Sequence, residues 1–186
     1  MTIYIALLRG INVGGKNMIK MAELKRVLEA LGLIDVQTYI QSGNLLFRSE
    51  EDEKSLSEKL QDEIKTAFGV SIPVILRTAA EFEGIMNNCP YSEAEVAEAE
   101  ALAGKECLHV ALLLQNPLQE KLEKLTPYCN EIDDYQVIGR EVYLLLRNGV
   151  YNSKLANSLT KLDVPETMRN WKTIKKLVEL AQAMES

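Results

Sequence analysis

The sequence has little of the chemistry on which most catalytic sites depend. It contains a single histidine, His109, and three cysteines, Cys89, Cys107 and Cys129. The cysteines are odd in number, far apart and without a C-x-x-C pair, which argues against a disulfide framework and a zinc site. His109 lies within an apolar run, where a buried structural role is commoner than that of a base. We therefore expect no metal and no cofactor, and whether the chain is an enzyme stays open.

Long apolar runs are also absent. None approaches the roughly 18 residues that a membrane-spanning helix needs, and no basic and then apolar leader precedes the first predicted strand. We therefore expect a cytoplasmic protein with no membrane partner. The net charge of −6 argues against a surface that grips nucleic acid as a whole. Acidic residues gather at 50–63 and 81–106, whereas basic residues gather toward the two ends of the chain.

Hydrophobic periodicity divides the first half of the chain into strands and helices. Strands are predicted at 3–8, 36–40, 44–47 and 70–76, and helices at 21–31 and 51–68. Gly32 and Gly69 end the two helices, and Pro73 indicates an edge strand because proline cannot donate to a central ladder. The order strand, helix, strand, strand, helix, strand is that of ferredoxin-like domains.

The second half repeats this order after an acidic helical stretch at 79–103. Strands are predicted at 107–115, 133–139, 140–147 and 167–169, and helices at 118–125, 153–162 and 171–184. The first strands of the two halves, IYIALLRGIN and LHVALLLQNP, are alike, which indicates duplication. The predicted fold is α+β, with two tandem ferredoxin-like (βαββαβ) subdomains and a C-terminal helix. The predicted divisions are 1–78, an acidic helical connector at 79–104, and 105–186.

The stretch GINVGGKN, residues 10–17, has the glycine and lysine spacing of a phosphate-binding loop. Asn17 stands where a serine or threonine would bind magnesium, and a hairpin follows instead of parallel crossovers, which argues against a nucleotide hydrolase. An anion cradle needs only backbone N–H groups and the charge of Lys16. A plain glycine turn is the competing interpretation.

Two other stretches could add polar groups. The side chains of QSGN, residues 41–44, could supply neutral donors and acceptors, although this is also ordinary hairpin-turn chemistry. In TMRNWKTIKK, Asn170 can cap the last helix and Trp171 can anchor the core. Alternatively, Arg169, Lys172 and Lys176 could lie along one exposed face and bind an anion.

We predict a protein that binds an anionic or phosphate-bearing small ligand, such as a nucleotide. The predicted ligand-binding residues are Arg9, Asn12, Gly14, Gly15, Lys16, Asn17, Ser42, Asn44, Arg169 and Asn170. One alternative is a nucleic-acid-binding module, although GNLLFRS lacks the aromatic pattern of RNA-recognition domains. The other is a protein-interaction or structural module, with the acidic segment 81–106 as its contact.

Four segments resemble a known family. LLRGINVGGKNMIKM, TYIQSGNLLF, VYLLLRNGVYNSKL and ETMRNWKTIKKL are similar to the signature segments of the bacterial domain-of-unknown-function family 1697. The resemblance implies a cytoplasmic bacterial protein with an α+β fold of two ferredoxin-like subdomains. It implies no established activity, but its segments coincide with the glycine loop, the hairpin and the Arg-Asn-Trp stretch.

Overall fold

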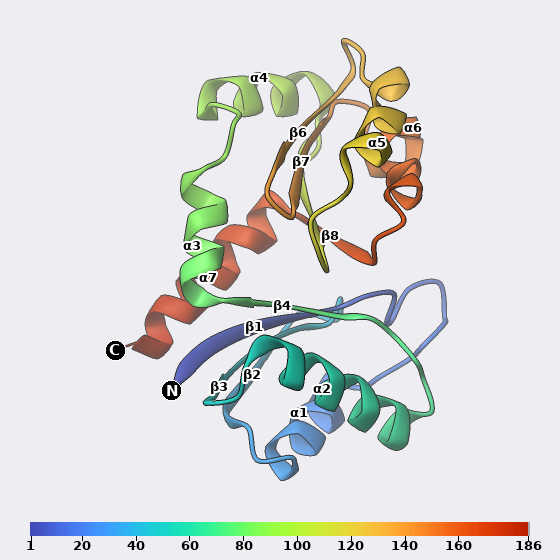
Figure 1. Cartoon of the computed structure of the whole chain (residues 1–186). Coiled ribbons are helices and arrows are strands. Elements are labelled where there is room, and N and C mark those ends of the chain that lie inside the picture. Colours follow the sequence, from blue (N-terminus) through green and yellow to red (C-terminus); the bar gives the residue numbers. More distant parts are fainter. Residues whose placement is uncertain (186) are drawn as a thin grey trace. The chain divides into compact units, whose positions relative to one another are not determined.

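A computed structural model describes residues 1–185 and shows an α+β protein with two compact units (Figure 1). Unit 1 comprises Met1–Gly84 together with the C-terminal residues from Lys176, and unit 2 comprises Ile85–Lys175. These limits differ from the predicted divisions, because the acidic stretch forms no separate connector and the last helix contributes residues to both units. Each unit contains one four-stranded antiparallel sheet. Within residues 1–185, no helix is long and apolar enough to cross a membrane.

Unit 1 is built on a sheet in the order β2-β3-β1-β4. Its elements are β1 (Thr2–Leu8), α1 (Met21–Ala30), β2 (Ile34–Tyr39), β3 (Asn44–Ser49), α2 (Glu53–Phe68) and β4 (Val74–Thr78). The predicted strands and helices of the first half are thus confirmed, with ends that shift by a few residues. Pro73 directly precedes β4, which is an edge strand as predicted.

Helices α1 and α2 lie on one face of the unit 1 sheet (Figure 1). Their apolar stripes, such as Leu24 and Leu28 of α1 and Leu60 of α2, pack with Ala6 and Leu8 of β1 in one core. Asp52 caps α2, because its Oδ1 accepts hydrogen bonds from the backbone N–H groups of Lys54 and Ser55 at 3.0 Å each. Gly69 ends α2 in the left-handed conformation, as predicted.

Unit 2 has a sheet in the matching order β6-β7-β5-β8. Its strands are β5 (Leu108–Leu113), β6 (Asp133–Ile138), β7 (Glu141–Leu146) and β8 (Glu166–Asn170). The short helical segments that pack on one face of this sheet are α5 (Gln119–Leu122), η1 (Glu123–Tyr128), η2 (Val150–Asn152), α6 (Lys154–Asn157) and η3 (Leu159–Leu162). The predicted helices at 118–125 and 153–162 were wrong in form. Each is a single α-helical turn joined to 3₁₀ turns, and Pro127 lies inside η1.

The acidic stretch forms two helices, α3 (Ala79–Asn87) and α4 (Glu93–Ala103), where one helical stretch was predicted. The break contains Pro90, whose ring prevents a continuous helix. Ser92 starts α4 with a capping box: its Oγ accepts from the Glu95 N–H at 3.2 Å, and Glu95 Oε2 accepts from the Ser92 N–H at 2.8 Å. The chain ends with α7 (Trp171–Glu185), as predicted.

The edge strands β4 and β8 carry an arginine at equivalent positions of the two sheets. Arg77 of β4 lies opposite Ile5 of β1, and Arg169 of β8 lies opposite Val110 of β5. Both arginines are buried. Two residues later, each edge strand has given way to a helix, which begins with Ala79 in unit 1 and with Trp171 in unit 2.

Candidate functional site

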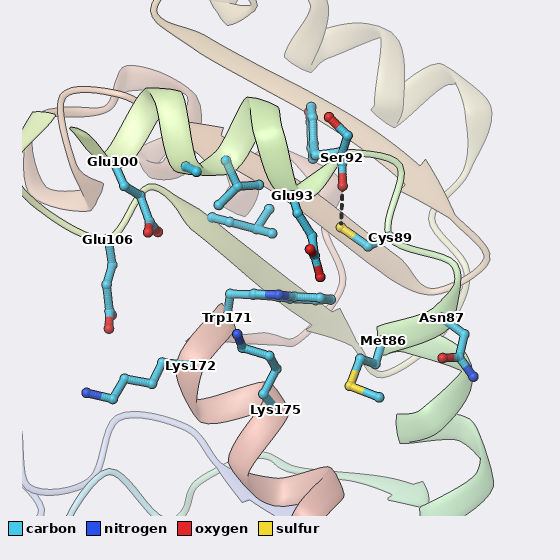
Figure 2. A pocket seen from close by; sticks show the side chains of 14 residues that line it. Met86, Asn87, Cys89, Ser92, Glu93, Glu100, Glu106, Trp171, Lys172 and Lys175 are labelled. Carbon is cyan, nitrogen blue, oxygen red and sulfur yellow. Dashed lines mark hydrogen bonds between the residues drawn. The ribbon is translucent and has the colours of Figure 1, made fainter. Parts of the chain in front are cut away.

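The largest pocket described here lies within unit 2 and has a volume of about 1040 Å³. Its lining residues come from α3, the loop between α3 and α4, α4, the segment that leads into β5, the start of β5 and the first two turns of α7: Met86, Asn87, Cys89, Tyr91, Ser92, Glu93, Val96, Ala97, Glu100, Glu106, Leu108, Trp171, Lys172 and Lys175. Figure 2 shows the Trp171 ring lying across this pocket. The side chains of Glu93 and Glu100 are on one side of the ring and those of Lys172 and Lys175 on the other.

Trp171 is positioned by the junction between β8 and α7. Asn170 caps the helix as predicted, because its Oδ1 accepts a hydrogen bond from the Thr173 N–H at 2.8 Å. Its Nδ2 donates to Glu106 Oε2, which ties the start of α7 to the segment before β5. Trp171 itself is half-buried and lines the pocket. The helix start is fixed, while part of the ring stays accessible to a ligand.

Two lysines accompany the ring on α7. Lys172 and Lys175 are exposed and stand three residues apart, which places them on adjoining parts of one helix face. Among residues 1–185 neither ammonium group makes an ion pair. Lys176 differs, since its Nζ lies 2.9 Å from Glu179 Oε2. The pocket thus holds two positive charges that are available to an anion.

Helix α4 supplies the opposite wall. The capping box fixes its first turn, which contains Glu93, and Glu100 stands two turns later. Glu100 Oε1 accepts a hydrogen bond from the Cys107 N–H at 3.2 Å. Glu93 makes no side-chain hydrogen bond or ion pair within the described part of the chain, and Figure 2 shows it pointing toward the Trp171 ring. The sequence had marked these acids only as a possible partner contact.

Two further polar groups of the pocket, Tyr91 and Cys89, are hydrogen-bonded within the protein. Tyr91 donates from its hydroxyl to Asp134 Oδ2 at 3.0 Å, and burial, reinforced by Asp134, raises the pKa of Tyr91 far above its usual range. The Cys89 thiol donates to the Tyr91 carbonyl oxygen at 3.5 Å, and burial raises the pKa of Cys89 as well. A thiol held in its neutral form is a poor nucleophile. The chemistry of the pocket is therefore suited to binding, with stacking at its centre and charge on both sides.

The glycine loop lies in unit 1 and forms a tight turn. Gly14 and Gly15 have φ values of +58° and +75°, and the Lys16 N–H donates to the Val13 carbonyl oxygen at 3.0 Å. Positive φ at both central residues is what a type I′ turn requires. Helix α1 begins only at Met21, so the glycine loop does not run directly into the N-terminus of a helix. A phosphate-binding loop does, and it thereby combines its own N–H groups with those of the helix.

Two asparagines brace this loop from inside. Asn12 Nδ2 donates to the carbonyl oxygens of Ile19 at 2.9 Å and Gln41 at 2.8 Å, while its Oδ1 accepts from the Ile19 N–H at 2.8 Å. Asn17 Nδ2 donates to the Gly10 carbonyl oxygen at 3.0 Å. Both carboxamides therefore hold the backbone, whereas the Lys16 side chain is exposed and makes no ion pair within residues 1–185.

The other predicted site residues divide between the two units. In unit 1, Asn44 is fully buried and donates from Nδ2 to the Tyr39 carbonyl oxygen at 3.0 Å and to Ser42 Oγ at 2.9 Å. Arg9 follows β1 and is half-buried. In unit 2, only Asn170 adjoins the pocket, through its bond to Glu106.

Arg169 does not share the exposed helix face that the sequence predicted for it. It lies in β8, is 8% exposed, and donates from Nη1 to Thr167 Oγ1 at 2.7 Å and to the Met168 carbonyl oxygen at 2.9 Å. Burial lowers the pKa of Arg169 to about 10. The guanidinium remains charged at neutral pH and is integrated into the sheet.

Comparison with known proteins places the chain among relatives. The model of a family described as "Protein of unknown function (DUF1697)" matches residues 1–143. Among solved structures, the conserved bacterial protein SP0830 from Streptococcus pneumoniae is 28% identical and has a TM-score of 0.72. That similarity covers 97% of this chain and 98% of the other. Among curated proteins, none matches the chain.

Proposed function

The chain belongs to the DUF1697 family of proteins of unknown function, and we propose that it binds a nucleotide in the pocket of unit 2. The observation that carries this proposal is a half-buried tryptophan ring beside two lysines without ion pairs. A base stacked on an aromatic side chain gains about 1–3 kcal/mol, whatever the base. Lys172 and Lys175 would bind the phosphate by charge-assisted hydrogen bonds.

The volume of the pocket agrees with a ligand of this kind. Small-molecule sites occupy about 300–1,000 Å³ and combine an apolar or aromatic surface with a few polar groups. The pocket of about 1040 Å³ slightly exceeds the top of that range. It offers Trp171 and Leu108 as apolar surface, with lysines and carboxylates around them.

The comparison of the two units supports a functional role for Trp171. Ala79 stands at the equivalent position of unit 1, two residues after the buried arginine of the edge strand. The same junction of strand and helix therefore forms with a methyl group in place of an indole. The fold does not need a large ring at this point, so the presence of Trp171 is better explained by a ligand.

The glycine loop is the other proposed anion site, and it supports the same ligand class. Lys16 is exposed, and the loop is braced by Asn12 and Asn17. A phosphate could be held by the N–H groups of Gly14 and Gly15 with Lys16. Because the turn already explains the glycines, this loop has weaker support than the pocket around Trp171.

The test uses Trp171, which is the only tryptophan, as its own reporter. We expect nucleoside monophosphates to change its fluorescence saturably, because the base stacks on the ring. The double variant Lys172→Gln/Lys175→Gln should bind at least tenfold more weakly, since it loses two charge-assisted hydrogen bonds of about 1.5–3 kcal/mol each.

Two matched variants separate the possible sites. Lys176→Gln removes a charge from the same helix outside the pocket, and Lys16→Ala removes the charge of the glycine loop; neither should alter binding at Trp171. Thermal-shift measurements with the same ligands report binding anywhere on the chain. A shift that Lys16→Ala abolishes while the double variant retains it would move the site to the glycine loop. No shift with any nucleotide would refute the function.

Two finer assignments also remain proposals. We propose a ferredoxin-like arrangement for each unit, supported by the strand orders β2-β3-β1-β4 and β6-β7-β5-β8 and by the order of elements along the chain. A cytoplasmic location is the expectation from the sequence.

A further inference from the structure

We infer that the pocket of unit 2 selects guanine among the nucleobases, with Glu93 as the residue that reads the ring. This inference rests on the proposed function and adds the identity of the base. Stacking on Trp171 and contacts between phosphate and lysine are the same for every nucleotide. Selection must therefore come from other polar groups of the pocket, and we assign it to Glu93 on α4.

The side-chain donors of the loop that leads into α4 are engaged, which leaves acceptors on this side of the pocket. The hydroxyl of Ser92 donates to Glu95 Oε2 at 2.7 Å, that of Tyr91 to Asp134, and the Cys89 thiol to a carbonyl oxygen. These donors are engaged within the protein. The carboxylate of Glu93 makes no hydrogen bond within residues 1–185, and a carboxylate can only accept.

The position of Glu93 brings this acceptor to the ligand. Its side chain points toward the Trp171 ring (Figure 2), so the carboxylate is within reach of a base that stacks there. The capping box of Ser92 and Glu95 fixes the turn that carries Glu93. The carboxylate therefore stands at a defined place beside the ring.

Guanine is the base whose edge matches one carboxylate. Its N1–H and its exocyclic amino group are adjacent donors, which can bond to both oxygens of Glu93 at once, and such bidentate pairs are strong and specific. Adenine presents an amino group beside the lone pair of N1, which repels a carboxylate oxygen. Uracil presents a single N–H between two carbonyl oxygens. Hypoxanthine keeps the N1–H of guanine but lacks the amino group.

The experiment compares four nucleotides by titration of Trp171 fluorescence. We expect guanosine monophosphate to bind at least tenfold more tightly than adenosine or uridine monophosphate, with inosine monophosphate between them. In Glu93→Gln, the affinity for guanosine monophosphate should fall at least tenfold, while that for adenosine monophosphate stays equal or rises, because an amide can donate to N1 of adenine. Glu98→Gln is the matched control, since Glu98 is exposed on the same helix outside the pocket.

The outcomes separate this inference from the proposed function. Equal affinities for guanosine and adenosine monophosphate, both weakened by Lys172→Gln/Lys175→Gln, would overturn guanine selection and leave nucleotide binding intact. An equal loss for both nucleotides in Glu93→Gln would overturn the assigned role of Glu93. No fluorescence change with any nucleotide would refute both proposals. Glu93 is exposed, so its variant should unfold at the wild-type midpoint.

Discussion

At the scale of single residues, the sole histidine links burial to stability. His109 is 9% exposed, and its Nδ1–H donates to the Cys107 carbonyl oxygen at 3.2 Å. Burial lowers the pKa of His109 below its ordinary 6.5, and the hydrogen bond to Cys107 opposes this only in part. The unfolded chain therefore takes up a proton first as the pH falls. The stability that neutral His109 contributes is present above pH 6.5 and is lost as the pH falls through the folded pKa.

We expect the free energy of unfolding in urea to fall between about pH 7.5 and about pH 5.5, and to fall less in His109→Gln, which cannot titrate. The fall in unfolding free energy should be larger in the wild type than in His109→Gln by about 1.4 kcal/mol for each tenfold loss of proton affinity of His109 in the folded state. Because there is one histidine, its imidazole signals in a nuclear magnetic resonance titration give the folded pKa directly. Equal pH dependence in both proteins, with an imidazole midpoint at or above 6.5, would contradict the burial argument.

The sequence predicted a structural His109, and its burial agrees, whereas it left open whether Trp171 anchors the core. Trp171, Ile174 and Val178 follow the helical spacing of one apolar stripe, and the latter two are buried. Trp171 occupies the first turn of α7 and is only half-buried. Periodicity identifies which side of a helix faces the core, but it does not show at which turn of the helix the burial of that side ends. The signal in the sequence that points to a ligand site is the pair of lysines, Lys172 and Lys175, which follow Trp171 on the same helix.

At the scale of elements, the capping box of α4 should control the proposed site. Glu95→Ala removes the acceptor for the Ser92 N–H and should destabilise the first turn of α4 by about 1 kcal/mol. Amide hydrogen exchange in that turn should then be about fivefold faster. Affinity for guanosine monophosphate should also fall, because Glu93 belongs to the same turn. Glu98→Ala, on the same helix outside the box, should change neither quantity, and equal effects of the two variants would contradict the role of the cap.

Elements were predictable where their apolar pattern was long. Helices α1, α2 and α7 and the buried strands β1, β3, β5 and β7 follow clear apolar patterns, and Asp52, Gly69 and Asn170 supply recognisable ends. The segments α5 with η1, and α6 with η3, are only one or two turns each, too short for the period to separate α-helix from 3₁₀ turns. Packing of Leu125, Leu155 and Leu159 into the unit 2 core determines their form instead.

At the scale of the whole molecule, the duplication visible in the sequence is present as two sheets with matching order. The likeness of the first strands was readable in the sequence, but the equivalence of Arg77 and Arg169 requires the strand register. By the same register, Ala79 of unit 1 is the equivalent of Trp171 in unit 2. Because unit 1 has no aromatic ring at this position, the proposed site belongs to unit 2 only. A pocket made by residues from 86 to 175 could not be assembled from local patterns, because it depends on which helix packs beside which strand.

The distribution of charge and burial favours the proposed mononucleotide over a nucleic acid as the ligand. RNA-recognition sheets bind bases on exposed aromatic residues of their central strands, whereas Tyr4, Phe47 and Tyr143 of β1, β3 and β7 are buried here. The net charge of −6 repels additional phosphates.

We therefore expect a short single-stranded guanine-containing RNA to bind no more than about threefold more tightly than guanosine monophosphate. Each phosphate neutralised on a single strand contributes about 0.7 to the slope of log affinity against log salt concentration. Since Lys172 and Lys175 are the only cations among the pocket-lining residues of the described chain, 1–185, the slope should not be steeper than about −1.4. Fluorescence titration at several salt concentrations measures it. A slope of −3 or steeper, with affinity that grows with RNA length, would show a polymer-binding surface beyond the pocket, because two lysines cannot release that many counterions.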